Sequence, residues 1–301
     1  MIRQSIQTVG VTAASSSPAW TAKDGLATLG PYASVLIREL DDVFRGWGAD
    51  RGALEVSYPG ALPVEDLQGI DYFKNFPHLG TAMAGLAPDS IHLYVDDGLT
   101  GAAAVPPEHL DESRFILPSA ACYPVYFNLR DTELDRDLLI TTQASCYRNE
   151  TSHNSLTRLW NFHMRELVFV GALDSAQAHL DHFRERVATF ADGLGVALRL
   201  ETATDPFFRP NDPRAMMQKI QPVKWEFVFG ENCAIASLNS HRNFFGERCS
   251  ITQNDGSLAF TSCVAFGLER WIHALSESFD GDLVAATAAV QAQGRDSLDH
   301  I

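Results

Sequence analysis

The sequence has few cysteines, and their arrangement defines no recognised framework. The five cysteines, Cys122, Cys146, Cys233, Cys249 and Cys263, are odd in number and widely spaced, with no C-x-x-C pair. A disulfide framework or a zinc finger is therefore not indicated. The residues alone favour free, mostly buried thiols.

The chain also lacks long apolar runs and an excess of basic charge. No stretch of about 18 residues is apolar throughout, so we expect no membrane span. The first twenty residues hold one Arg and no sustained apolar run, so we expect a cytoplasmic protein without a signal peptide. With 23 Lys and Arg against 38 Asp and Glu, the formal charge is −15. This balance argues against a general nucleic-acid binder.

The remaining composition is that of a globular protein. The 301 residues are 46% hydrophobic and 20% charged, which excludes disorder on composition and allows a sizeable core. Residues 137–148 and 162–170 favour strands, and a polar run separates them. The pair predicts an antiparallel hairpin with a functional loop.

The clearest helix is predicted over residues 175–192, where apolar residues recur at spacings of three and four. Asp174 or Ser175 is expected to cap its start, and Gly193 and Gly195 to close its end. The other expected elements are helices at 31–48 and 267–277, strands at 54–58, 196–200, 223–229, 234–238 and 258–264, and a weak helix or tail over the last twenty residues. Interspersed helices and long-range antiparallel strands predict a single α+β domain.

Three short segments carry residues with chemical potential. In CYRNE at 146–150, Arg148 and Glu150 share one strand face and could hold a polyanionic ligand, or form a surface ion pair. Glu166 lies among apolar neighbours, which calls for a metal or a nearby Arg as partner. In AFGLER at 265–270, Arg270 sits where a helix start favours anions, although a surface Arg is the simpler reading.

Together these segments resemble a known family. YRNE at 147–150 and LWNFHMRE at 159–166 are similar to motif 2 of class II aminoacyl-tRNA synthetases, AFGLER to motif 3, and VSYP at 56–59 to the end of motif 1. More closely, residues 55–275 resemble the short bacterial amino acid:[carrier protein] ligases, relatives of the atypical zinc-dependent seryl-tRNA synthetases. The resemblance implies an antiparallel sheet flanked by helices, with residues 1–50 as a partly flexible N-terminal segment and helix and 51–301 as the catalytic domain.

The resemblance also implies an ATP site. Arg148 would hold the α-phosphate, Glu150 would contact the adenine amino group, and Phe162 would stack on adenine. Arg270 would stack on its other face or hold the γ-phosphate, so Arg148 and Arg270 are the expected catalytic residues. ATP would bind with Mg²⁺, for which the sequence identifies no ligand.

A zinc site and an amino-acid site follow from the same resemblance. Cys122, Glu166 and Cys263 match the family's zinc ligands, and three protein ligands leave an open position for the substrate's amino group. The residues expected to line the substrate pocket are Lys224, Glu226 and Asn239. The family's relatives favour small amino acids.

The implied function is ATP-dependent activation of a small amino acid and its transfer to the phosphopantetheine thiol of a carrier protein. Two alternatives remain: transfer to tRNA or another biosynthetic acceptor, and a non-catalytic regulatory paralogue. The acidic charge makes tRNA less favoured. The basic segment 209–224 is a candidate docking site for an acidic carrier protein, or else a solvated face. Because motif 1 usually builds a dimer interface, we expect a homodimer.

Overall fold

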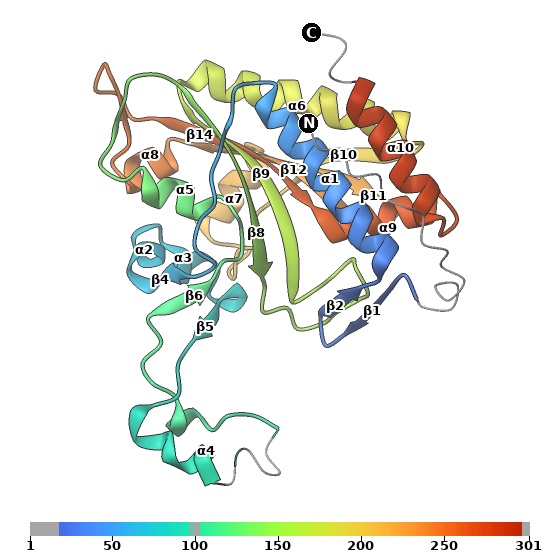
Figure 1. Cartoon of the computed structure of the whole chain (residues 1–301). Coiled ribbons are helices and arrows are strands. Elements are labelled where there is room, and N and C mark those ends of the chain that lie inside the picture. The colour runs from blue at the N-terminus through green and yellow to red at the C-terminus, as the bar shows by residue number, and fades with distance from the viewer. Residues whose placement is uncertain (1–17, 97, 99–102, 297–301) are drawn as a thin grey trace, which may run out of the picture.

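The computed structural model describes residues 18–96, 98 and 103–296, except for the side chains at 96, 214, 215, 295 and 296. A seven-stranded sheet runs through the molecule in the order β10-β11-β12-β14-β9-β8-β3 (Figure 1). Its strands are β3 (Leu54–Glu55), β8 (Leu138–Tyr147), β9 (Asn161–Gly171), β10 (Leu198–Ala203), β11 (Lys224–Phe229), β12 (Cys233–Arg242) and β14 (Phe260–Gly267). Every pairing is antiparallel except that of β3 with β8.

One face of this sheet is covered by long helices. These are α1 (Pro31–Ala49), α6 (Leu173–Gly193), α9 (Leu268–Ser278) and α10 (Leu283–Asp296) (Figure 1). Their apolar stripes pack with sheet residues such as Leu167 and Phe266 into the main core. Phe44 of α1 stacks on Phe266 at 4.0 Å between ring centroids, beside Trp271 of α9. The opposite face of the sheet is left for shorter elements and the site.

Shorter elements border that opposite face. Two of these elements are short helices that begin at Tyr72 and Tyr123, and the fully buried Tyr72 and Tyr126 pack them into a second core cluster. The short helices on this side are α2 (Val64–Gly69), α3 (Tyr72–Asn75), α5 (Tyr123–Asn128), α7 (Pro213–Ile220) and α8 (Phe244–Arg248). Small sheets join β4 (Leu62–Pro63) and β5 (Thr81–Met83) to β6 (Phe115–Leu117), and β7 (Glu133–Leu134) to β13 (Thr252–Gln253). The segment with α4 (His92–Asp96) extends away from the body (Figure 1).

Most of the expected elements are present. The β8–β9 hairpin forms as predicted, with Leu138 opposite Val170 and Tyr147 opposite Asn161. The helix predicted over 175–192 is α6, but neither Asp174 nor Ser175 caps it, because the N-cap is Ala172 without a side-chain hydrogen bond. The strand predicted at 54–58 pairs only over Leu54–Glu55. The last residues described form α10, whose Ala286 and Val290 are fully buried.

An N-terminal hairpin was not anticipated. Strands β1 (Trp20–Lys23) and β2 (Leu26–Leu29) pair through a two-residue turn, Asp24 and Gly25, with φ values of 53° and 76°. Positive φ at both positions is typical of a type I′ turn, for which Asp-Gly is a preferred sequence. The dipeptide was therefore a usable signal for this hairpin.

The predicted division between residues 1–50 and 51–301 stays a prediction. Helix α1 packs in the same core as α9 and α10, and residues 1–17 lie outside the described part of the chain. Across the described helices, none has the length and apolar character needed to cross a membrane.

Candidate active site

The strand register gathers the candidate residues on one face of the sheet. Glu166 on β9 lies opposite Ala265 on β14, so Cys263, two residues away, is its diagonal neighbour on the same face. Across the next pairing, Asn239 on β12 lies opposite Cys263. Lys224 on β11 in turn lies opposite Asn239. Four strands thus contribute to one surface, because side chains alternate along each of them.

A buried cluster of potential metal ligands occupies this face. Cys122, Glu166 and Cys263 each offer a ligand atom, and these atoms all lie within 4.8 Å of one another. The three residues are 5%, 1% and 2% exposed. Cys122 immediately precedes α5, so the cluster joins a helix start to two adjacent strands. Two thiols and a carboxylate form a donor set that suits Zn²⁺.

Glu166 is held without an arginine partner among its described contacts. Its Oε1 accepts hydrogen bonds from the backbone N–H groups of Ala121 (2.8 Å) and Cys122 (3.1 Å). The neighbouring Arg165 points to the other face of the sheet and forms an ion pair with Asp41 at 2.6 Å. The sequence suggested either a metal or a nearby Arg as the partner of Glu166. Among the described residues, the structure shows no Arg paired with it.

Each member of the cluster resists ionisation in this environment. The hydrogen bond with Cys263, burial and the nearby Glu166 raise the pKa of Cys122 well above its ordinary value. Cys263 has its pKa raised to about 11: the hydrogen bond with Cys122 lowers it, and burial and Glu166 outweigh that effect. Burial also raises the pKa of Glu166. A divalent cation among the three groups would stabilise their charged forms.

Two further side chains contact Cys263. Asn239 donates from Nδ2 to Cys263 Sγ at 3.4 Å. His241 Nε2 lies 3.7 Å from the same sulfur, while its Nδ1 lies 3.2 Å from the Tyr126 hydroxyl and 3.3 Å from Thr261 Oγ1. Burial lowers the pKa of His241 to about 4, so the ring is neutral near pH 7. These contacts fix the position of one sulfur of the cluster.

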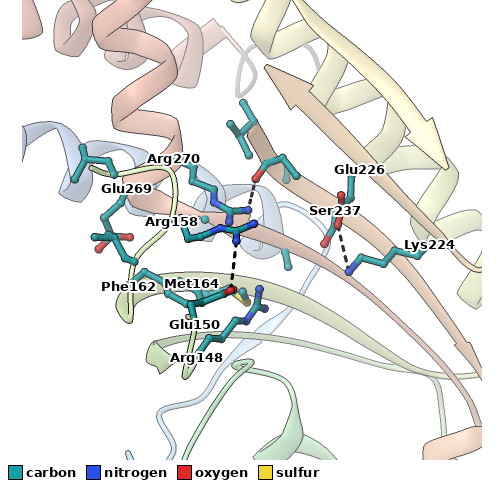
Figure 2. Close-up of a pocket in the computed structure, with 17 residues that line it drawn as sticks. Arg148, Glu150, Arg158, Phe162, Met164, Lys224, Glu226, Ser237, Glu269 and Arg270 are labelled. Carbon is teal, nitrogen blue, oxygen red and sulfur yellow. Dashed lines mark hydrogen bonds and ion pairs between the residues drawn. The ribbon is translucent and has the colours of Figure 1, made fainter. Parts of the chain in front are cut away.

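The residues expected to bind ATP lie together farther along the same face (Figure 2). Arg148 lies with its guanidinium 5.1 Å from the centre of the Phe162 ring and donates from Nε to Ser119 O at 3.1 Å. Glu150 is 3.8 Å from Arg158, a residue that the sequence did not single out. Phe162, Glu150 and Arg158 line one pocket with Arg270.

Arg270 is half-buried and directed into this pocket from the start of α9. It donates from Nε to Thr157 O at 2.9 Å and from Nη1 to Ala234 O at 2.8 Å. Burial, and next the charge of Arg148, lower its pKa. Its described hydrogen bonds therefore go to carbonyl oxygens, and two guanidinium groups face the same space. That arrangement favours a bound anion.

An acidic residue beside Arg270 joins two parts of this site. Glu269 accepts hydrogen bonds from the backbone N–H of His163 at 2.8 Å and pairs with its ring Nδ1 at 2.6 Å. This hydrogen bond raises the pKa of His163. Phe162 precedes His163 in the chain, and Arg270 follows Glu269. The contact between His163 and Glu269 therefore sets the spacing of Phe162 and Arg270, the two groups expected to hold adenine.

The two ends open into one cavity of about 780 Å³. Its walls include Arg148 and Arg270 at one end and Glu166 and Cys263 at the other. Between them, Lys224 forms ion pairs with Glu226 at 3.3 Å and Asp205 at 3.6 Å. Nine of the ten residues predicted for the site line this cavity, and the tenth, Phe162, lines the smaller pocket that shares Arg148 and Arg270 with it. The sequence analysis did not single out Arg158, Asp205, Ser237 or His241, although DPFF at 205–208 and SLNSHRNFFG at 237–246 also resemble the family.

Known proteins resemble the chain in both sequence and fold. It is 31% identical over 250 residues to amino acid–[acyl-carrier-protein] ligase 1 of Bradyrhizobium diazoefficiens, covering 80% of this chain and 76% of that protein. It is 25% identical over 183 residues to the type-2 serine–tRNA ligase of Methanopyrus kandleri, covering 55% of this chain and 35% of that protein. No model of a known protein family matches the sequence.

Solved structures agree on the fold. The seryl-tRNA synthetase of M. kandleri, in a complex with tRNA, superposes with a TM-score of 0.74 at 18% identity, covering 93% of this chain and 58% of that one. A Giardia lamblia prolyl-tRNA synthetase gives 0.63 at 13% identity, covering 84% and 48%. The fold is that of a class II aminoacyl-tRNA synthetase catalytic core, as the motifs predicted. The sequence relationship is more specific, and the chain belongs to the amino acid–[acyl-carrier-protein] ligase family.

Proposed function

We propose that the protein activates a small amino acid with ATP and transfers it to the phosphopantetheine thiol of a carrier protein. The observation that carries this proposal is the single cavity with two arginines at one end and the Cys122–Glu166–Cys263 cluster at the other. A ligase of this kind must hold a polyphosphate and an amino acid side by side. Membership of the ligase family supports the same reaction.

ATP is proposed to bind at the arginine end with Mg²⁺. Phe162 offers an apolar ring to adenine, and Glu150 a carboxylate to its amino group, while Arg270 covers the other face of adenine or holds the γ-phosphate. Arg148 is directed to the α-phosphate. In the first step, a carboxylate oxygen of the amino acid attacks the α-phosphorus and pyrophosphate leaves. Arg148 and Arg270 stabilise the negative charge that builds up at this centre.

The amino acid is proposed to bind at the cluster end. The donor set, burial and mutual proximity of Cys122, Glu166 and Cys263 fit Zn²⁺. Zinc there would offer an open coordination position to the neutral α-amino group and so select amino acids over simple carboxylic acids. Lys224, Glu226 and Asn239 border the space between the two ends and are proposed to orient the substrate.

The carrier protein is proposed to dock on residues 209–224. Within this segment, Arg209 and Lys219 are exposed, as are the apolar side chains of Met217 and Ile220. Pro213, Met217 and Gln218 border the cavity, so a docked partner would sit at its mouth. The side chain of Arg214, also expected to contribute, lies outside the described residues. The formal charge of −15 gives tRNA less support as the acceptor.

Charge reversal would test this docking site. Lys219→Glu should weaken transfer to a pantetheinylated carrier protein and leave adenylate formation unchanged, because only the second step requires docking. Arg38→Glu is the matched control, since Arg38 is exposed on α1 across the sheet. An equal loss of both steps in Lys219→Glu would exclude the docking role.

A homodimer and a cytoplasmic location complete the proposal. Leu54 on the edge strand β3 is 56% exposed, and this strand lies between α1 and VSYP at 56–59, which is similar to the end of motif 1. A second copy would cover this edge. ATP and a pantetheinylated carrier protein as substrates favour the cytoplasm. Sedimentation velocity would test the dimer directly.

The decisive experiment is amino-acid-dependent ATP–pyrophosphate exchange across the twenty amino acids, with and without a zinc chelator. We expect exchange with one or two small amino acids and its loss on chelation. Transfer assays with a pantetheinylated carrier protein and with tRNA would then identify the acceptor. Zinc-loaded protein that gives no exchange with any amino acid would contradict the proposed reaction.

A further inference from the structure

The loop between β8 and β9 forms a wall of the proposed ATP site. Residues 148–160 carry Arg148, Glu150 and Arg158, all of which line the pocket. The whole loop lies between β8 and β9, so Arg148 and Glu150 are not on the strand that the sequence predicted, and Asn154 and Arg158 form an isolated bridge within it. A loop that carries binding groups needs support from elsewhere to hold them within hydrogen-bonding distance of a ligand.

The N-terminal hairpin β1–β2 contacts this loop through its turn and its first strand. The carbonyl oxygen of Gly25 accepts hydrogen bonds from the backbone N–H groups of Trp160 (2.9 Å) and Asn161 (3.3 Å). At the start of β1, Trp20 donates from Nε1 to Ser155 Oγ at 3.0 Å. These contacts join segments that are more than 130 residues apart in the chain. They hold the loop at Ser155 and at its end, Trp160.

Close packing at the hairpin turn leaves no room for a side chain. A Cβ on Gly25 would lie 2.7 Å from the Trp160 Cβ and 2.7 Å from Nε2 of His153, closer than such atoms approach. Gly25 also has a φ of 76°, which disfavours other residues. The turn is therefore seated against the loop rather than merely near it.

The supported loop leads directly to the groups that face the nucleotide. The backbone N–H of Arg148 donates to Trp160 O at 2.9 Å, so Trp160 links the hairpin turn to Arg148. Thr157 of the same loop accepts the hydrogen bond from Arg270 Nε at 2.9 Å. A displacement of the loop would thus move or release both arginines.

We propose that the hairpin Trp20–Leu29 is a positioning element for the ATP site, which holds loop 148–160 in its nucleotide-binding conformation. This inference rests on the proposed function of the pocket. The hairpin lies outside residues 55–275, whose sequence carries the family motifs, and its residues do not line the pocket. We therefore expect the hairpin to affect the end of the cavity with Arg148 and Arg270 (the nucleotide end) and to leave the Cys122–Glu166–Cys263 end unaffected.

The test compares two glycine substitutions with the same backbone strain. Gly25→Ala places a methyl group against the loop, whereas Gly52→Ala has the same φ of 76° and nothing within 4 Å of its Cβ. Because a misplacement of about 1 Å can cost about 100-fold, we expect Gly25→Ala to raise the Kd for ATP about tenfold or more. Gly52→Ala should leave it unchanged. Zinc content and the KM for the amino acid should be normal in both variants.

A milder pair keeps the test informative if Gly25→Ala folds poorly. Trp20→Phe retains an aromatic ring but removes the indole donor, and Ser155→Ala removes its acceptor. Each should raise the Kd for ATP by a few-fold, and the double variant should be no worse than either single one, because both lose the same hydrogen bond. Hydrogen exchange at Trp160 and Asn161 should speed up in Gly25→Ala.

The outcomes separate this inference from the proposed function. If the folded Gly25→Ala and Gly52→Ala proteins bind ATP equally well, the hairpin has no positioning role and the proposed reaction stands. If the wild type binds ATP but gives no amino-acid-dependent exchange, the reaction is wrong, and the Kd values still decide the role of the hairpin. A wild type that does not bind ATP would overturn both.

Discussion

The two ends of the cavity are held in place in different ways. At the cluster end, Glu166 and Cys263 stand on adjacent strands of the sheet and are almost wholly buried. At the nucleotide end, Glu150 and Arg158 belong to a loop that the N-terminal hairpin supports from outside. A buried site on paired strands is held by the sheet itself, whereas groups on a loop depend on other segments for their position.

This difference suggests how the work is divided. Selection of a small amino group is best served by a rigid, buried site. ATP, on the proposed function, binds against a loop whose position depends on contacts with the N-terminal hairpin. The comparison predicts that the two ends can be damaged independently, and each prediction below tests that independence or its limits.

The largest effect is expected from removal of a cluster residue. Cys263→Ala should abolish zinc binding and amino-acid-dependent exchange, because the remaining groups do not complete the three-residue donor set. ATP should still bind with nearly unchanged Kd, since the nucleotide end is built from other elements. Metal content by mass spectrometry and calorimetric ATP titration would measure both. Cys249→Ala, which also removes a buried thiol, is the control and should keep its metal.

The next effect concerns the scaffold shared by both ends. His179 on α6 is buried, and its pKa is lowered to about 3, mainly by burial. The folded state therefore favours the neutral ring. This contribution to the free energy of unfolding is fully present above about pH 6.5, the pKa of His in the unfolded chain. It is lost as the pH falls toward 3, because the unfolded chain binds a proton that the buried ring does not. At about 1.4 kcal/mol per unit, the loss approaches about 4–5 kcal/mol.

Denaturant unfolding from pH 7 to pH 3 would measure this loss. Replacement of His179 by Gln, which can still donate to Leu167 O, should flatten the acid slope relative to the wild type. Both ends of the cavity should lose function together as the scaffold unfolds. An unchanged slope in the variant would mean that other groups control acid unfolding.

A smaller effect is expected from damage to the nucleotide end alone. Arg270→Ala should lower the rate of adenylate formation about 10²–10³-fold, the range found when one charge-stabilising donor is removed. The metal should remain bound in full. Exchange kinetics and metal content would be measured together, with Arg38→Ala as the exposed control. Loss of metal in Arg270→Ala would show that the two ends are coupled.

The smallest effect is expected beside the cluster. His241→Phe keeps an aromatic ring but removes the contact with Cys263 Sγ. Loss of such an outer partner typically lowers metal affinity about 10–100-fold, so we expect a change in that range in chelator competition. ATP affinity should not change. His273→Phe, on α9 at the other face, is the control, and equal affinities in both variants would exclude a supporting role for His241.

Local patterns predicted much of the fold. The three- and four-residue spacing of apolar residues predicted α6, and the two strands around a polar loop predicted β8 and β9, because each element depends on neighbours close in the chain. The predicted start of this helix was wrong. Asp174 and Ser175 had the chemistry of an N-cap, yet α6 begins earlier, at Leu173.

The motifs also predicted most of the site residues, but they did so through resemblance to a known family and not through residue spacing. Nothing local connects Cys122, Glu166 and Cys263, and the family likeness supplied that grouping. His241 and Asp205 lie in segments that resemble the family, but the resemblance gave them no role, and their contacts with Cys263 and Lys224 place them at the site. The Asp24–Gly25 signal was present in the chain, but its importance depends on what the turn packs against.

The amino-acid sequence by itself determined the helices α1, α6 and α9, the β8–β9 hairpin, the acidic charge and the motifs that mark the family. The tertiary structure decided the order of the strands, in which β14 lies between β9 and β12. That order and its register set Cys263 diagonally across from Glu166 and opposite Asn239. It also seated the N-terminal hairpin against the loop. The reason is physical: periodicity acts over a few residues, whereas register and close packing are fixed by contacts between segments far apart in the chain.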